Sequence, residues 1–356
     1  MDPSLSHTQT FESREIIKVA ESTDNTETNQ ASTTVPEQFA ITARGAFPSE
    51  DEARMIATQI GQVVRQFSRV FNLSELDGVT VAEDYAQALA ELDRGYESSH
   101  TLTPSEGAVV GVAMTPSVLR DGMLKSHIVF NAQYLWPLLD DTHPDFQSAL
   151  HIVAHECAHV EITGKFEAAI PGVLLRKCFR DIRDRARSDV ILACWDEYAA
   201  TRLSAGFGED PTEGYEETLI KHMGTARQEA NESIKAYRLH GDVEKVYCEA
   251  YRAYGNLLKY AAYYLGNLAG HGLELYKRPN FDAALDGHWF KAYFHRLYEA
   301  CNTIAAQYGT WRDQGVFEVI GDIADDMVAE GGILCTSLQD GGLYFDIPLT
   351  PETVPW

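Results

Sequence analysis

Residues 146–160 read FQSALHIVAHECAHV, and the interpretation of the whole chain starts from this stretch. Its apolar residues recur at the spacing of one helix face: Phe146, Leu150, Val153 and Ala154. Thr142 and Asp145 are suited to cap the start of this helix, and Pro144 is expected in its first turn. The sequence therefore predicts a helix with a buried side that runs to about Val160.

The same stretch contains the side chains of a zinc site. On a helix, residues four apart lie one turn above each other, so His155 and His159 can bind one ion. Neutral imidazole is a common zinc ligand. Glu156 would lie beside the metal, where its carboxylate can take a proton from a zinc-bound water. We therefore expect Zn²⁺ as the cofactor, His155 and His159 as ligands and Glu156 as the catalytic residue.

A catalytic zinc needs a third protein ligand and an open position for water. The metzincin pattern would require Gly at 162 and His at 165, but Ile162 and Lys165 stand there. A glutamate from a downstream helix is the other common arrangement, and residues 195–202, WDEYAATR, supply Glu197 among small residues. Glu197 is the predicted third ligand, and the neighbouring Asp196 is the alternative.

This order of elements resembles that of the gluzincin metallopeptidases, whose familiar member is thermolysin. The resemblance covers about residues 41–206 and consists of a helix, strands, His-Glu-x-x-His, and a second helix with a glutamate. It implies a zincin-like core in a compact gluzincin layout, in which activated water attacks a peptide carbonyl. It also implies that a preceding strand offers its edge to an extended peptide or protein substrate.

Two departures from the thermolysin pattern leave details open. Where such enzymes have an aspartate that orients the first histidine, this chain has Thr201, so that partner must come from elsewhere, such as Asp196 or a backbone carbonyl. The segment between His159 and Glu197 is also longer than in the thermolysin type. Three residues are candidates to stabilise the oxyanion: Tyr198, His222 and His271.

The remaining pattern predicts an α+β fold, mostly helical, with a small antiparallel sheet. Helices are expected at 49–71, 85–92, 189–205, 247–268, 289–306 and 316–329, and strands at 78–82, 107–114, 125–130 and 343–347. Residues 116–122 are expected to connect the two middle strands. We predict a disordered polar tail at 1–40, a zincin-like core at 41–210, and a helical C-terminal region at 211–356.

Charge and composition narrow the function classes. The formal net charge of −24 disfavours binding to nucleic acid and to anionic membranes. No stretch reaches the ~20 apolar residues of a membrane span, and the N-terminus lacks a signal-peptide pattern. Six widely spaced cysteines, none in a Cys-x-x-Cys pair, favour reduced thiols and a cytoplasmic protein. The oligomeric state is not predicted.

Several histidines and tyrosines outside the motif are expected to have structural roles. His151 precedes His155 by one turn, but three ligands rarely converge from one straight helix, so a packed or hydrogen-bonded role is expected. His288 and His295 are expected to be core or surface residues, and the tyrosines between 247 and 264 are expected to pack.

The alternative function is a metal-stabilised binding or regulatory protein with a degenerate peptidase fold. A zinc hydrolase of non-peptide amides or esters is a third possibility.

Overall fold

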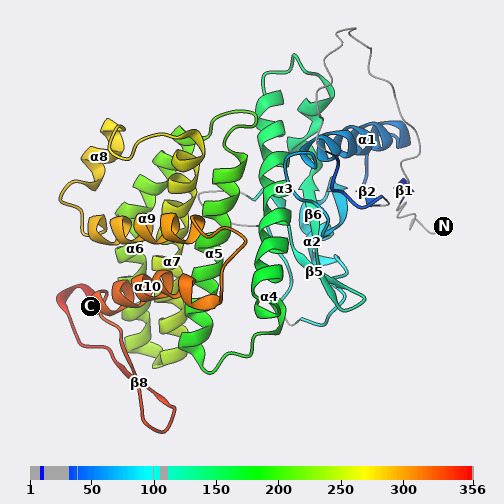
Figure 1. Cartoon of the computed structure of the whole chain (residues 1–356). Helices are drawn as coiled ribbons and strands as arrows, with labels where there is room; N and C mark the ends of the chain where they lie inside the picture. Colours follow the sequence, from blue (N-terminus) through cyan, green and yellow to red (C-terminus); the bar gives the residue numbers. More distant parts are fainter. Residues whose placement is uncertain (1–8, 12–31, 38, 99, 105–110, 355–356) are drawn as a thin grey trace. The chain divides into compact units, whose positions relative to one another are not determined.

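The fold was analysed in a computed structural model of the whole chain, which describes residues 9–11, 32–37, 39–98, 100–104 and 111–354. It is α+β and mostly helical, as the sequence predicts (Figure 1). The chain divides into two compact units. The first runs to Gly164 and includes Phe207–Glu209, and the second comprises residues 165–206 and 210–356.

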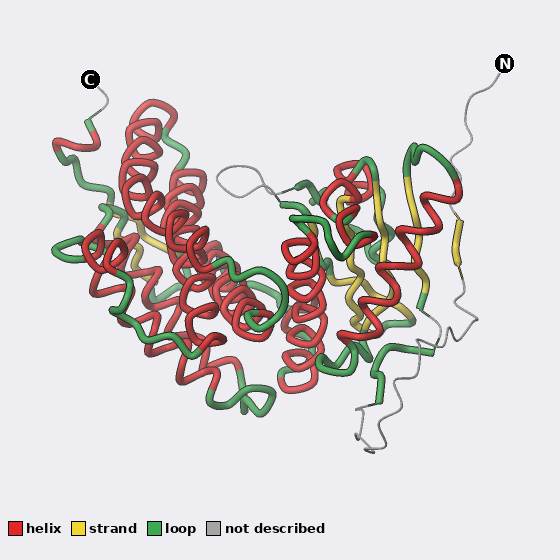
Figure 2. Tube along the Cα trace, turned by 90° about the horizontal axis from the view of Figure 1, so that it is seen from above, coloured by secondary structure: helices red, strands yellow, loops and turns green. Residues whose placement is uncertain are grey.

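The first unit contains a mixed sheet, whose strands are drawn in yellow in Figure 2. Its order is β1-β2-β3-β6-β4, and β5 also pairs with β6. The strands are β1 (Gln9–Phe11), β2 (Ala40–Arg44), β3 (Leu76–Ala82), β4 (Ala113–Met114), β5 (Ser117–Arg120) and β6 (Met123–Asn131). Strands β2, β3 and β6 run parallel and the others antiparallel, so this sheet is mixed, whereas the sequence predicts a small antiparallel sheet.

Helix α1 (Glu50–Phe67) begins where its cap predicts. The hydroxyl of Ser49 accepts a hydrogen bond from the Glu52 backbone N–H at 3.2 Å, which satisfies one of the free donors of the first turn. The helix ends at Phe67 instead of Phe71, and Val70, which lies inside the predicted range, is 60% exposed. The short helix α2 (Tyr85–Ala90) follows β3, and 3₁₀ turns occupy Ala132–Tyr134 and Trp136–Leu139.

The predicted connection at 116–122 is instead a strand and a tight turn. Strand β5 pairs with β6 so that Arg120 lies opposite Met123, which leaves a two-residue loop. Both loop residues, Asp121 and Gly122, have positive φ angles of 52° and 76°. Asp-Gly is the usual sequence of such a hairpin turn, so the signal was present in the sequence.

Helix α3 (Phe146–Ala169) starts at Phe146, later than predicted, since Pro144 was expected in its first turn, and it continues nine residues beyond Val160. Its C-terminal part belongs to the second unit, where Phe166 is buried. The ring of Phe166 lies 5.3 Å from that of Phe317 and 6.1 Å from that of Trp311. Tertiary packing of this ring stabilises the extension despite Gly164, which has low helix propensity.

The second unit is built from helices. They are α4 (Val173–Arg176), α5 (Ile182–Ser204), α6 (Thr212–His240), α7 (Val243–His271), α8 (Pro279–Leu285), α9 (Lys291–Ala305) and α10 (Glu318–Glu330). Short 3₁₀ turns occupy Gln314–Phe317 and Pro351–Thr353, and strands β7 (Leu334–Ser337) and β8 (Leu343–Asp346) form an antiparallel pair. Helix α5 starts seven residues before the predicted Asp189.

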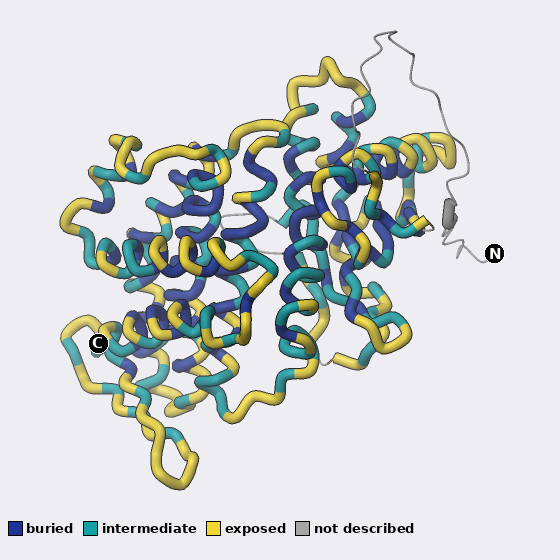
Figure 3. The backbone as a smooth tube through the Cα atoms, viewed as in Figure 1, coloured by how far each residue is buried: buried dark blue, intermediate teal, exposed yellow. Residues whose placement is uncertain are grey.

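Helices α5 and α7 pack unusually closely, and glycines of α7 allow it. A Cβ atom on Gly255 would lie 2.6 Å from Val190, and one on Gly266 would lie 2.2 Å from the Tyr198 carbonyl oxygen. From the first contact to the second the residue numbers rise on both helices, so α5 and α7 run parallel. Buried residues line both helices (Figure 3), and this seam is the core of the second unit.

The remaining expectations are met in part. Most of the predicted tail lies outside the described residues, but residues 9–11 form β1, and Val35 and Phe39 are buried. The Thr34 hydroxyl donates to the Phe71 carbonyl at 2.8 Å, so the end of this segment is packed rather than disordered. All six cysteines are free thiols. Among the described residues, no helix is long and apolar enough to cross a membrane.

Candidate metal and catalytic site

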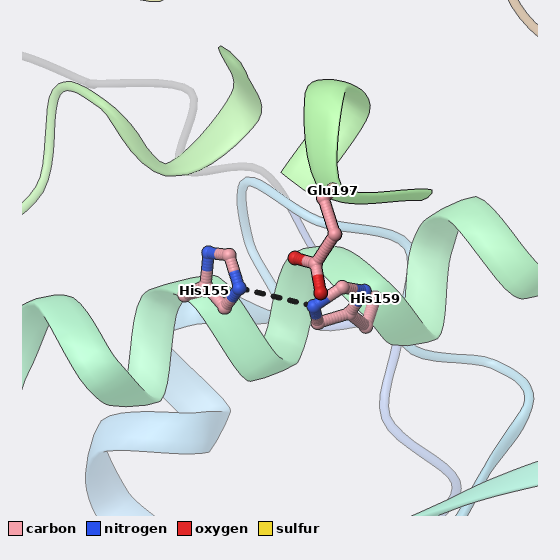
Figure 4. A group of neighbouring side chains, drawn as sticks. All are labelled: His155, His159 and Glu197. Atoms are coloured by element: carbon pink, nitrogen blue, oxygen red, sulfur yellow. Dashed lines mark hydrogen bonds between the residues drawn. The ribbon is translucent and has the colours of Figure 1, made fainter. Parts of the chain in front are cut away.

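The two histidines of the motif face each other on α3. Their Nε2 atoms lie 3.0 Å apart, and one ring donates a hydrogen bond to the other (Figure 4). The ring planes are nearly perpendicular, with centroids 4.6 Å apart. His159 is buried and His155 half-buried. The spacing of four residues therefore brings the two nitrogens to one point, as the sequence predicts.

This arrangement fits a tetrahedral metal. Two nitrogens that each lie about 2.0–2.1 Å from a zinc ion at tetrahedral angles are about 3.4 Å apart. The Nε2 separation of 3.0 Å is within a few tenths of an ångström of that value. A small rotation of either ring would admit an ion between His155 and His159 without a change in the backbone of α3.

Glu156 lies beside this pair in sequence and has a partner of its own. Its side chain is buried, and its Oε2 accepts a hydrogen bond of 2.6 Å from the Thr115 hydroxyl. Thr115 directly follows β4, the last strand in the sheet order. The carboxylate of Glu156 is thereby fixed at the end of an edge strand. Thr115 could not be predicted from the sequence, because no local pattern connects it to a residue 41 positions away.

Tyr85 is a second neighbour of Glu156 that the sequence did not reveal. It is 4% exposed and packs in a cluster with Val129 and with Met114, the residue before Thr115. Burial, and then the charge of Glu156, raises the pKa of the Tyr85 phenol. Its hydroxyl has no hydrogen-bond partner among the described residues. The phenol is therefore a neutral, available donor close to Glu156.

Glu197 and its alternative Asp196 lie on α5 in the second unit, and both are half-buried. Burial first, and then the charges of Glu197 and Glu229, raises the pKa of Tyr260 on α7, so Glu197 lies near that ring. The Thr201 hydroxyl donates to the Glu197 backbone carbonyl at 2.8 Å. Thr201 is thus engaged within its own helix and does not replace the missing aspartate.

The three candidates for oxyanion stabilisation have different surroundings. Tyr198 is buried and its hydroxyl donates to Asn302 at 3.3 Å, while His271 pairs with Asp210 at 3.2 Å. Both side chains are therefore engaged in structural contacts within the second unit. The ring of His222 stacks on Tyr260 at a centroid distance of 4.1 Å. Because Tyr260 is near Glu197, His222 is the best supported of the three.

Histidines expected to be structural do have structural contacts. The Nδ1 of His151 donates to the Phe207 carbonyl at 2.9 Å, within the first unit. His295 shares a hydrogen bond of 2.7 Å with the Tyr276 hydroxyl, and the ring of His288 lies against Trp289. These contacts agree with the predicted structural roles.

In comparisons with known proteins, no family model, no curated protein and no solved structure matches this chain. Among the chain's own residues, the facing imidazoles of His155 and His159 and the fixed carboxylate of Glu156 are the most informative about function.

Proposed function

We propose that the protein is a zinc-dependent metallopeptidase of the gluzincin type. In this proposal His155, His159 and Glu197 hold one zinc ion, and Glu156 is the general base. The observation that carries it is the pair of Nε2 atoms 3.0 Å apart on α3, next to a carboxylate that is already fixed.

Glu197 is the proposed third ligand because two imidazoles and one carboxylate are the ligand set of many hydrolytic zinc sites. Figure 4 draws the three proposed ligands, His155, His159 and Glu197. Asp196, the neighbouring carboxylate on α5, is the alternative.

The roles of the chain's own residues follow from their contacts. A bound zinc ion would lower the pKa of a coordinated water and polarise a peptide carbonyl. Glu156 would accept the proton of the attacking water and pass it to the leaving amine. The hydrogen bond from Thr115 would hold the carboxylate in one orientation through both transfers.

The substrate would bind as an extended peptide. Strand β4 is terminal in the sheet order of the described residues, and it ends next to Thr115. A peptide that added to this edge by backbone hydrogen bonds would have its backbone close to Glu156. This arrangement supports endopeptidase action. The free cysteines suit a reducing compartment such as the cytoplasm.

Metal content and cleavage test the proposal together. We expect about one zinc ion per wild-type chain by mass spectrometry. His155→Ala and Glu197→Ala should lose it, and Glu156→Gln should keep it while losing cleavage of a fluorogenic peptide library. His143→Ala is the matched control, because this exposed histidine lies just outside α3.

The outcomes separate the parts of the proposal. Full retention of zinc by His155→Ala would refute the metal site. If Asp196→Ala lost zinc and Glu197→Ala retained it, Asp196 would be the third ligand in place of Glu197. A Glu156→Gln protein that still performed the biological function would favour the metal-stabilised binding protein. Bound zinc without cleavage of any peptide would favour a non-peptide amide or ester substrate.

A further inference from the structure

A groove within the second unit lies along the seam between α5 and α7, and all of its lining residues belong to these two helices. Its volume is about 300 Å³, at the lower end of the range for ligand pockets. Since one water molecule takes about 30 Å³ in the liquid, the groove has room for at least about ten non-hydrogen atoms. It is therefore large enough for a small organic molecule.

The lining of the groove is apolar where the two helices meet. A Cβ atom on Gly255 would lie 2.6 Å from Val190, so the backbones of α5 and α7 nearly touch at this point. The small side chains of Ala186 and Ala193 leave space beside the contact, and both line the groove. The apolar part of a ligand would be buried against these residues.

Three cationic side chains stand around this apolar lining: Arg185 from α5, and Arg252 and Lys259 from α7. Arg185 and Arg252 are exposed, and Lys259 is half-buried. In the part of the chain that the structure describes, none of the three forms an ion pair with a carboxylate. A chain with 53 acidic and 29 basic residues has many carboxylates that could pair with them. The groove therefore offers positive charge that the protein itself does not neutralise.

The two arginines lie at the same end of the groove. Burial first raises the pKa of Cys248, which also lines the groove, and the charges of Arg185 and Arg252 lower it. Both guanidinium groups are therefore close to this thiol, although they come from different helices. The ammonium of Lys259 lies over the Tyr260 ring at 5.4 Å, about two turns further along α7.

The charge balance of the lining favours an anion. Asp189 is its single acidic residue, against three cations, and Glu244, whose charge also acts on Cys248, does not line the groove. A neighbouring hollow between α6 and α7 shares Arg252 but is lined by three glutamates, so it does not suit an anion. The positive charge is therefore a property of the α5–α7 groove and not of this whole surface.

We propose that this groove binds a small amphipathic anion, a carboxylate with an aliphatic chain of the size of octanoate. The carboxylate would accept hydrogen bonds from Arg185 and Arg252, because the guanidinium group matches the geometry of a carboxylate. The chain would cover the apolar lining. This ligand site is additional to the proposed peptidase function and does not depend on it.

Calorimetry with the full-length protein tests the charge of the ligand. The probes are octanoate, octanamide and octylammonium, which share the aliphatic chain and differ in the charge of the head group. We expect octanoate to bind with a Kd below about 1 mM. Octanamide should bind at least about tenfold more weakly, because hydrogen bonds to a charged group are the stronger ones. Equal affinity for octanoate and octylammonium, or no detectable binding of octanoate, would overturn the inference.

Two variants test the head-group position. Arg185→Gln and Arg252→Gln should each weaken octanoate binding about fivefold or more and leave octanamide binding unchanged. Both side chains are exposed, so neither change removes a buried contact. The matched control is Lys277→Gln, which removes one charge from an exposed lysine of the same unit that pairs with Glu274. Equal losses in the control and in the two arginine variants would overturn the inference, because they would show an effect of net charge alone.

A carboxylate can also bind to zinc, so the proposed metal site needs its own control. His155→Ala, which should lack zinc, should bind octanoate as tightly as the wild type. Loss of octanoate binding in this variant would overturn the inference. Octanoate binding in a protein that cleaves no peptide would leave the groove assignment standing while the proposed function fails.

A chemical measurement needs no change in the groove. Cys248 lines it and is exposed, and the other exposed thiol, Cys178, can be removed as Cys178→Ser. Octanoate should slow the alkylation of Cys248 by N-ethylmaleimide, followed by mass spectrometry of the peptide that contains it, and octylammonium should not. Equal alkylation rates with and without octanoate would overturn the inference.

Discussion

At the scale of single residues, the hydroxyl of Thr115 is the contact that orients the proposed general base. We predict that Thr115→Val, which keeps the shape and removes the hydrogen bond, lowers kcat about tenfold. The reason is that a hydrogen bond to a charged group contributes about 1.5–3 kcal/mol. Steady-state kinetics and zinc content would be measured together, and the metal content should not change.

The control for this prediction is Thr142→Val. The Thr142 hydroxyl also donates to a carboxylate, that of Asp140, at 2.6 Å, but this pair is exposed and precedes α3. We expect no change in kcat from it. An unchanged kcat in Thr115→Val would mean that Glu156 is held by other contacts.

At the scale of elements, Asp325 joins three helices of the second unit. It lies on α10 and accepts hydrogen bonds from Arg183 and Arg187 of α5 and from Tyr251 of α7. Burial alone would raise the pKa of Asp325, but these two arginines and the tyrosine lower it overall. The ionised carboxylate therefore stabilises the packing of α5, α7 and α10.

We predict that Asp325→Asn lowers the free energy of unfolding at pH 7 by about 3 kcal/mol, the cost of breaking a buried ion pair. Because the folded pKa is lowered, this contribution is present above the unfolded pKa of about 3.9 and is lost as the pH falls through the folded value. Urea unfolding at pH 7 and pH 3 should show the difference between variant and wild type shrinking at pH 3.

The surface neighbour Asp326 provides the comparison. It pairs with Arg296 at 2.8 Å, and its side chain is 57% exposed. Asp326→Asn should cost less than about 1 kcal/mol at either pH. A similar loss of unfolding free energy in both variants would contradict the role of Asp325 in stabilising the packing of α5, α7 and α10.

What the sequence could predict differs between elements. The start of α1 and the facing histidines of α3 depend on residues within one or two turns, so local patterns were sufficient. The sheet was predicted wrongly because the five-residue strand β2 was missed. Strand β2, helix α1 and strand β3 together form a strand–helix–strand unit, and the two strands of such a unit usually pair in parallel. Thr115 escaped prediction because only the sheet brings it to Glu156.

At the scale of the whole molecule, zinc should contribute to stability. An ion that binds only the folded state at a free concentration 100 times its Kd stabilises that state by about 2.7 kcal/mol. We predict that removal of zinc by a chelator lowers the Tm by several degrees and that added zinc restores it, measured by calorimetry. His155→Ala should show no zinc-dependent shift, and an equal shift in that variant would indicate metal binding elsewhere.

The course of α3 has a consequence for anyone who wishes to divide this protein. The chain passes from the first unit to the second inside a continuous helix, between Gly164 and Lys165, and returns briefly at Phe207–Glu209. Neither unit is one uninterrupted stretch of sequence. A gene fragment that ended at the boundary would cut α3 and expose the buried side chains of Ile162 and Phe166 on its two halves. Shuffling or truncation of this protein should therefore treat α3 as indivisible.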